Sequence, residues 1–220
     1  MAQEHRLLET DFRHESLEFA RRIMRKAKAE FERIALTLVA EGFRFSSLDG
    51  PIKKPDPNTS IWVSDLRHRN IHIPLVLEAW LAEVGGVDFM GSHPEWSAPG
   101  YCFGNKPDPA GLLFTDAFVC ELTAEYVEYL YEEWQSDESA TLTPFRIDFS
   151  PDHLHKANIS GGLPYQMSAG RPSIDSIVLN ERHCTSFMGL VRLALQWRGF
   201  PGFDDISNEG TWSKIGPKLV

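Results

Sequence analysis

The sequence has few cysteines and lacks any segment that would carry it into or through a membrane. Three cysteines occur in 220 residues, at positions 102, 120 and 184, and no Cys-x-x-Cys pair is present. An odd number of distant cysteines argues against a disulfide framework or a zinc cluster. No apolar run approaches the ~18 residues of a membrane span, and the first residues lack the apolar stretch of a secretory signal. We therefore expect a cytoplasmic protein.

The usual catalytic and nucleotide-binding signatures are also missing. Neither the phosphate loop G-x-x-x-x-G-K-[ST] nor the dinucleotide pattern G-x-G-x-x-G occurs. The nucleophile elbow G-x-S-x-G fails at Ser160, because Asn158 stands where glycine is needed. The adjacent acids at 132–133 and 204–205 lack the context of a buried acid–base pair. The sequence therefore predicts a protein that is not an enzyme and needs no cofactor.

Positive charge is scarce in the middle of the chain. The protein has a formal net charge of −9. Residues 45–150 hold six basic and seventeen acidic side chains, a balance of −11, whereas each flanking segment is nearly neutral. Such a segment repels nucleic acids and anionic membranes and attracts basic proteins. We expect a basic protein partner, with no nucleic acid and no membrane.

Helix and strand patterns are intermixed along the chain. Apolar residues recur at helical spacing over 16–41. Pro74 suits the first turn of a helix that Gly85 and Gly86 end, and Thr123 suits the N-cap of another over 122–136. The remaining expectations are a helix over 185–199 and strands at 61–65, 87–90, 111–120, 145–149, 163–167 and 173–180. This order predicts an α+β fold, with helices packed on a mostly antiparallel sheet.

The chain is long enough for one fairly large domain, and no internal repeat divides it. We expect a single α+β domain over 1–220. A long N-terminal helix lies within 1–42, and 203–220 form a weakly patterned tail.

Two segments are candidates for a partner-binding surface. The first is acidic and includes Glu121, Glu125, Glu128 and Glu132, which are spaced to lie along one side of a helix if it extends back that far. The second is the loop over 92–110, whose Trp96 and Tyr101 are candidate aromatic anchors. Charged rims around aromatic anchors are typical of protein interfaces.

The stretch "HLHKANISGGLPYQM" at 153–167 raises an alternative. His153 and His155 point to one side if the chain is extended, which is half of a metal site, and His183 is a candidate third ligand. This arrangement would make the protein a metal-assisted hydrolase. The Gly-Gly pair at 161–162 more simply favours a turn before a strand.

The sequence resembles the SUKH superfamily, which includes bacterial immunity proteins and the fungal Smi/Knr cell-wall regulators. The resemblance rests on "IPLVLEAWLAEVGG", a Pro-led helix with Trp80 in its middle and a Gly pair at its end, and on "TSFMGLVRLALQWRGFPG" as a closing helix. The "KPDP" step at 106–109 and the stretch "HKANISGGLPYQM" are also similar to this type. The match covers parts of 70–202, and the long N-terminal helix and residues 43–60 depart from the compact family pattern.

The resemblance implies a SUKH-like α+β fold and a protein that neutralises a toxin, often a nuclease. It implies no catalytic residues. The expected function is therefore a binding module that acts as an immunity protein. A metal-assisted hydrolase using His153 and His155 and a regulatory adaptor remain as alternatives.

Overall fold

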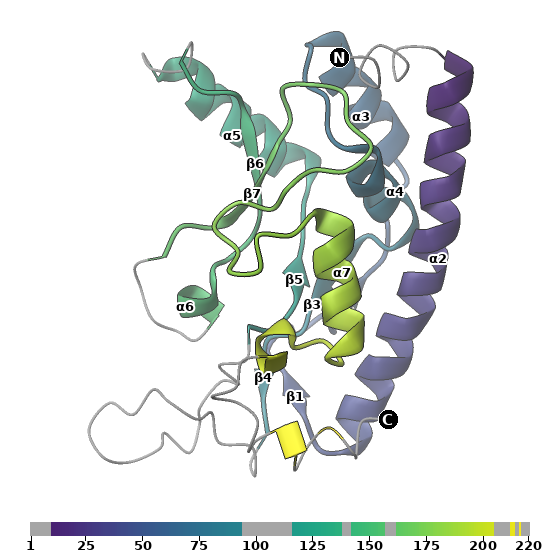
Figure 1. Ribbon diagram of the computed structural model, residues 1–220, viewed down its shortest axis with the longest axis vertical. Helices are drawn as coiled ribbons and strands as arrows, with labels where there is room; N and C mark the ends of the chain where they lie inside the picture. Colours follow the sequence, from purple (N-terminus) through teal and green to yellow (C-terminus); the bar gives the residue numbers. More distant parts are fainter. Residues whose placement is uncertain are drawn as a thin grey trace.

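The computed structural model describes residues 10–93, 116–137, 142–156, 162–204, 212–213 and 216. Helices and short strands are mixed along the chain, as expected for an α+β protein (Figure 1). The helices are α2 (Thr10–Ala40), α3 (Thr59–His68), α4 (Leu75–Glu83), α5 (Ala124–Ser136), α6 (His153–Lys156), α7 (Phe187–Gln196) and the 3-10 helix η1 (Pro201–Asp204). The strands are β1 (Arg44–Phe45), β2 (Ile52–Lys53), β3 (Gly86–Asp88), β4 (Gly91–Ser92), β5 (Val119–Cys120), β6 (Arg146–Ser150) and β7 (Tyr165–Ser168).

Helix α2 runs along one side of the molecule and packs against α4 and α7 (Figure 1). Its buried residues recur every three or four positions, which makes one apolar stripe: Ala20, Met24, Ala27, Phe31, Ile34 and Leu38. Gly42 ends the helix with a φ of 93°, a left-handed conformation that glycine adopts without strain. The predicted helix over 16–41 is confirmed and begins six residues earlier.

The Pro74-led helix and its glycine stop are confirmed. Pro74 immediately precedes α4, and almost every side chain of α4 is buried, Trp80 completely. Gly85 has a φ of 89°, and a Cβ there would lie 2.4 Å from the Lys53 carbonyl oxygen. The chain then enters β3, which pairs with β2 and β5. Glycine at 85 is therefore needed both for the turn and for the close approach of β2.

Within the residues that the structure describes, the strands form three small antiparallel sheets rather than one large one. Their orders are β1–β4, β2–β3–β5 and β6–β7. The second sheet contacts the third through β5 and β6, and α5 packs against β6. The expected antiparallel pairing is thus present, but it is divided among short ribbons because most strands have only two or three residues.

Aromatic rings fill the centre of the molecule. Phe31 of α2 stacks on Phe118 with ring centroids 5.2 Å apart, and meets Trp80 edge-on at 5.7 Å. Trp80 in turn contacts Phe187 of α7 at 5.6 Å. Edge-to-face pairs of this kind add to the free energy gained by burial. One buried cluster therefore joins α2, α4, β5 and α7.

Three expectations about local structure need correction. Residues 61–65 lie in helix α3, with Val63 and Leu66 buried one turn apart, and not in a strand. Residues 173–180 form only isolated bridges, Leu179 with Gln166 and Ile177 with Ser186. The tail was expected to begin at 203, yet Phe203 is buried and packs on Trp212 at 5.1 Å.

Candidate functional site

Helix α5 is positioned by its cap and its inner face. Thr123 accepts a hydrogen bond from the Tyr126 backbone nitrogen at 3.2 Å, as predicted for the N-cap. Val127 is buried, and the rings of Tyr131 and Trp134 pack on Phe145 at 5.3 and 5.7 Å. The predicted helix over 122–136 is confirmed, and its inner face anchors it to β6.

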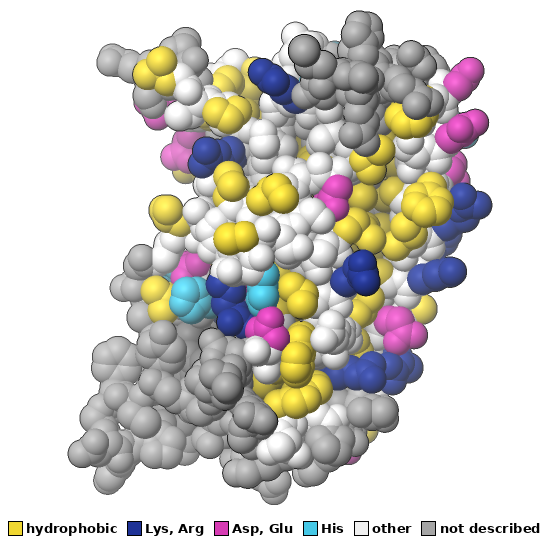
Figure 2. All heavy atoms as spheres, viewed as in Figure 1, with side chains coloured by type: hydrophobic (Ala, Val, Ile, Leu, Met, Phe, Trp, Pro, Cys, Tyr) yellow, Lys and Arg dark blue, Asp and Glu magenta, His cyan; other side chains and the backbone are white. Residues whose placement is uncertain are grey.

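The outer face of α5 is acidic and carries two exposed rings. Its exposed residues include Glu125, Tyr126, Glu128, Tyr129, Glu132 and Glu133. Tyr126 is 41% exposed and Tyr129 53%, and their rings lie nearly parallel with centroids 6.4 Å apart. Acidic side chains are visible at the edge of the molecule where α5 lies (Figure 2). We call the six residues the α5 face.

The structure separates the predicted row of glutamates into two that form ion pairs and two that do not. Glu121 precedes the helix, and its carboxylate lies 2.9 Å from the ammonium of Lys53. Glu128 lies 3.4 Å from the guanidinium of Arg69. Among the described residues, Glu125 and Glu132 have no ion pair. They are therefore the two glutamates of the predicted row whose charge no described residue neutralises.

Two pockets lie on either side of Tyr126. The first, of about 380 Å³, is bordered by β2, α3 and the first turn of α5 and includes Trp62 and Glu125. The second, of about 290 Å³, lies between α5 and the strands β5 and β6. Both are lined by Glu121 and Tyr126. The α5 face therefore adjoins two pockets.

The smaller pocket is acidic, and Asp88, Glu121 and Asp148 line it without any basic residue. Asp88 accepts a hydrogen bond from the Met90 nitrogen at 2.8 Å, and Asp148 accepts one from Gln166 at 2.8 Å. Burial nevertheless raises the pKa of both aspartates, and the charge of Glu121 adds to the effect at Asp88. A cation entering this pocket would stabilise the charged forms of Asp88 and Asp148, which burial disfavours, whereas Glu121 is already paired with Lys53. We call these three residues the acidic pocket.

The second predicted segment gives no structural information. Trp96 and Tyr101 lie outside the described residues. Their role as aromatic anchors stays a prediction.

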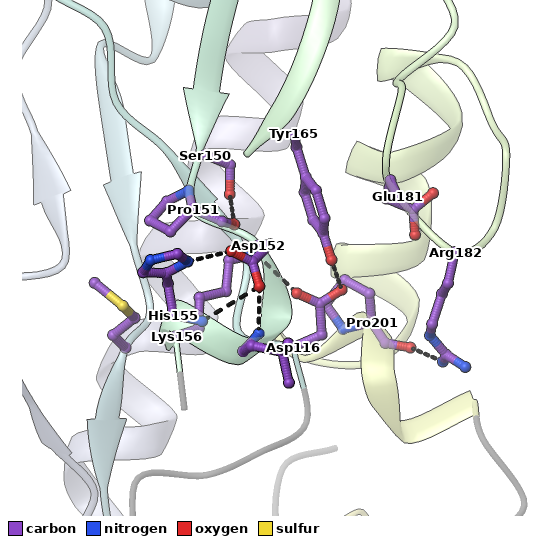
Figure 3. A network of polar contacts seen from close by, with 12 residues as sticks. Asp116, Ser150, Pro151, Asp152, His155, Lys156, Tyr165, Glu181, Arg182 and Pro201 are labelled. Atoms are coloured by element: carbon purple, nitrogen blue, oxygen red, sulfur yellow. Dashed lines mark hydrogen bonds and ion pairs between the residues drawn. The ribbon is translucent and has the colours of Figure 1, made fainter. Parts of the chain in front are cut away.

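Sequence reasoning missed a buried network of charged and polar side chains that come from the residues before β5, the end of α6 and the start of β7 (Figure 3). The Lys156 ammonium lies 2.7 Å from one Asp116 oxygen, and the Tyr165 hydroxyl donates to the other at 2.9 Å. All three side chains are almost fully buried. Burial first, and then the charge of Asp116, raises the pKa of Tyr165, which keeps its hydroxyl protonated as a donor.

Two carboxylate–histidine pairs lie beside this network. Asp152 receives backbone hydrogen bonds at the start of α6 and contacts His155 Nδ1. Although burial acts to raise the pKa of Asp152, the hydrogen bonds from His155 and the backbone outweigh it and lower that pKa. Glu181 contacts His183 Nδ1, and Asp204 lies 2.6 Å from His183 Nε2. Sequence analysis did not single out the buried acids Asp116, Asp152 and Glu181.

The three candidate metal ligands do not converge. His153 and His155 lie in helix α6, where residues two apart point to different sides, so the extended H-x-H arrangement is wrong. His155 is held by Asp152, and His183 by Glu181 and Asp204. Within the described ranges, no group of three histidine, cysteine or acidic side chains is placed to hold a metal ion.

Histidine, basic and acidic side chains are seen together near α6 on one face of the molecule (Figure 2). Four side chains of this region have acidic partners: Lys156, His155, Arg182 and His183. A carboxylate can fix the tautomer of a histidine for general base catalysis. Among the residues placed by the structure, however, no hydroxyl or thiol is hydrogen-bonded to His155 Nε2. The described contacts hold α6 to Asp116, and hold Arg182 and His183 to Asp204.

Comparison with known proteins identifies no relative. No helix in the described part of the chain has the length and apolarity needed to cross a membrane. No protein-family model, curated protein or solved structure matches the chain.

Proposed function

We propose that this protein is a non-catalytic binding module that binds a basic protein through the α5 face and the acidic pocket. The observation that carries the proposal is the position of Tyr126. This exposed ring lines both pockets and lies beside Glu125, which has no ion pair among the described residues, and the smaller pocket adds the carboxylates of Asp88, Glu121 and Asp148. Exposed tyrosines surrounded by charge are typical anchors of protein interfaces.

The chemistry of the acidic pocket favours a lysine or arginine side chain as the group that enters it. The pocket is small, and Met90, Val119 and Phe149 supply apolar walls beside the carboxylates. A long basic side chain has an apolar stem and a cationic head, and so matches both parts of the lining. Complementary charge would also speed association and make it sensitive to salt.

The resemblance to SUKH immunity proteins suggests what the basic protein is. We propose a toxin, such as a nuclease, that this chain neutralises by covering its basic surface. The α+β fold and the acidic face are compatible with that role. A regulatory adaptor would use the same surface, and only the identity of the partner distinguishes the two.

The test is co-expression with any basic protein that is encoded next to this chain, with toxicity and binding measured together. We expect the wild type to restore growth and to bind more weakly as salt rises. The variant Glu125→Lys/Glu132→Lys should lose both properties. The matched control Glu15→Lys/Glu32→Lys changes the net charge equally on the exposed face of α2 and should keep both.

Three outcomes would reject parts of the proposal. Equal binding by the two double variants would show that the α5 face is not the interface. Binding that is independent of salt would remove the role of charge. Binding to a neighbouring protein that is not toxic would replace the immunity function with that of an adaptor.

A further inference from the structure

A third pocket differs from the α5 site in both place and charge. It has a volume of about 360 Å³ and lies between the start of α2, helix α3, the first turn of α4 and the segment around Pro172. It shares no lining residue with the two pockets around Tyr126. Two arginines, Arg13 and Arg67, face it, so in an otherwise acidic protein it is locally basic. We call it the arginine pocket.

Backbone hydrogen bonds hold the floor of the arginine pocket. The His72 nitrogen donates to the Ala169 carbonyl at 2.7 Å, and the Leu75 nitrogen donates to the Ser173 carbonyl at 3.0 Å. These bonds join the chain before α4 to the segment after β7. The pocket is therefore formed before any ligand arrives, which lowers the entropic cost of binding.

The two arginines are not equivalent. Arg13 is paired with Glu78, whose side chain is only 10% exposed. Arg67 donates from Nε to the Val63 carbonyl at 3.3 Å. Its two terminal nitrogens have no partner among the described residues. Arg67 therefore offers the planar pair of N–H groups that binds a carboxylate in a bidentate manner.

Charge decides which anion the pocket suits. Burial and then the neighbouring charge of Arg67 lower the pKa of His72, so its ring is neutral at pH 7. Burial also lowers the pKa of Arg13, and repulsion from Arg67 adds to this. With Arg13 offset by Glu78, one positive charge is left without compensation. A single negative charge matches it, whereas a phosphate dianion does not.

Four apolar residues, Val63, Ile73, Leu75 and Pro172, also line the pocket, together with His14 and Ser173. We propose that the arginine pocket binds a small organic monocarboxylate, with the carboxylate on Arg67 and the apolar chain against the four apolar residues. This site is independent of the proposed binding of a basic protein, because neither its residues nor its charge are shared with the α5 face.

Hexanoate is a suitable probe, and titration of the full chain by calorimetry at pH 7 tests the proposal. We expect saturable binding of hexanoate, and none of hexanol, which lacks the charge, or of inorganic phosphate, which lacks the apolar chain. The variant Arg67→Gln should weaken hexanoate binding about tenfold or more, because it removes a charge-assisted pair of hydrogen bonds. The matched control Arg33→Gln, on an exposed arginine of α2, should bind like the wild type.

A second variant tests the site without removing Arg67. Ser173 lines the pocket and is only partly buried, so Ser173→Asp places a negative charge there with little effect on packing. We expect it to weaken hexanoate binding as Arg67→Gln does. Equal binding of hexanoate by Ser173→Asp and the wild type would overturn the proposal, as would phosphate binding more tightly than hexanoate. Absence of saturable hexanoate binding to the folded wild type would also overturn it.

Discussion

The ammonium of Lys156 lies 2.7 Å from the carboxylate of Asp116, and both side chains are about 95% buried. The two residues are 40 positions apart, and they join the short helix α6 to the residues before β5. Asp116 has a φ of 53°, a left-handed conformation that aspartate and asparagine tolerate better than other residues with side chains. The pair thus fixes a strained backbone position as well as two charges.

Replacing Lys156 with methionine should destabilise the protein strongly. The substitution leaves Asp116 as a buried charge without its cation, and we expect a loss of about 3–5 kcal/mol in the free energy of unfolding. Urea denaturation measures this loss. The control Lys53→Met breaks the more exposed pair with Glu121 and should cost no more than about 1 kcal/mol.

The double variant Lys156→Met/Asp116→Asn removes both charges of the buried ion pair. It therefore shows how much of the loss in Lys156→Met comes from the Asp116 charge that is left without its cation. Asparagine keeps the left-handed backbone and can accept from Tyr165 without a charge. We expect this variant to be more stable than Lys156→Met alone. Equal stability of the two would show that the Asp116 charge is not the source of the loss.

Tyr165→Phe should destabilise the protein by about 1–3 kcal/mol at pH 7, because Asp116 then loses a buried donor. The stability advantage of the wild type over this variant should fall as pH rises above about 10. The pKa of Tyr165 is raised in the folded protein, so above that pH only the unfolded chain releases the proton. Unfolding curves at pH 7 and 10.5 provide the comparison. The variant Tyr129→Phe, which alters an exposed ring, should show no loss at pH 7.

Asp88→Asn should stabilise the protein and weaken partner binding. Burial raises the pKa of Asp88, so its charge lowers stability at pH 7, and asparagine can still accept from the Met90 nitrogen. We expect a gain of about 1 kcal/mol. This gain should shrink as pH falls through the raised pKa, because protonation then removes the same charge from the wild type.

Thermal unfolding from pH 7 to 4, together with binding of the basic partner, measures both effects. The control Asp65→Asn alters an exposed acid of α3 and should change neither. A destabilised Asp88→Asn variant that still binds normally would contradict a role for this carboxylate in the acidic pocket.

Alanine variants of two glycines with nearly the same backbone conformation distinguish the cost of backbone strain from the cost of steric overlap. Gly50 and Gly85 have φ values of 88° and 89°, but a Cβ at Gly50 would meet nothing within 4 Å. We expect Gly50→Ala to cost about 1–2 kcal/mol from the left-handed conformation alone. Gly85→Ala should cost clearly more, because its Cβ would overlap the backbone of Lys53 and Lys54. Urea denaturation of both variants tests this, and equal losses would show that β2 can move away.

Much of the helical structure was predictable because it depends on local patterns. The stripe of α2, the Pro74 start and Gly85 stop of α4, and the Thr123 cap of α5 all lie within a few residues of the helices that they define. Helix α3 was missed because its isoleucine and valine favour strands locally. Packing of Val63 and Leu66 one turn apart outweighs that preference.

The acidic character of α5 was evident from the sequence. Which of its glutamates form ion pairs was not. Pairing of Glu121 with Lys53 and of Glu128 with Arg69 joins residues 68 and 59 positions apart. No spacing rule reaches so far along the chain. Which two glutamates lack an ion pair among the described residues was therefore evident only when the helices had been placed.

The sequence by itself determined the class of fold, the main helices and the excess of negative charge, because helical periodicity, caps and composition act locally or add over the chain. Only the tertiary structure decided which charges are buried, which are paired and where the pockets lie. Lys156, Asp116 and Tyr165 illustrate the reason. The free energy of a buried charge depends on groups that folding brings within 3 Å, and these groups are far apart in the unfolded chain.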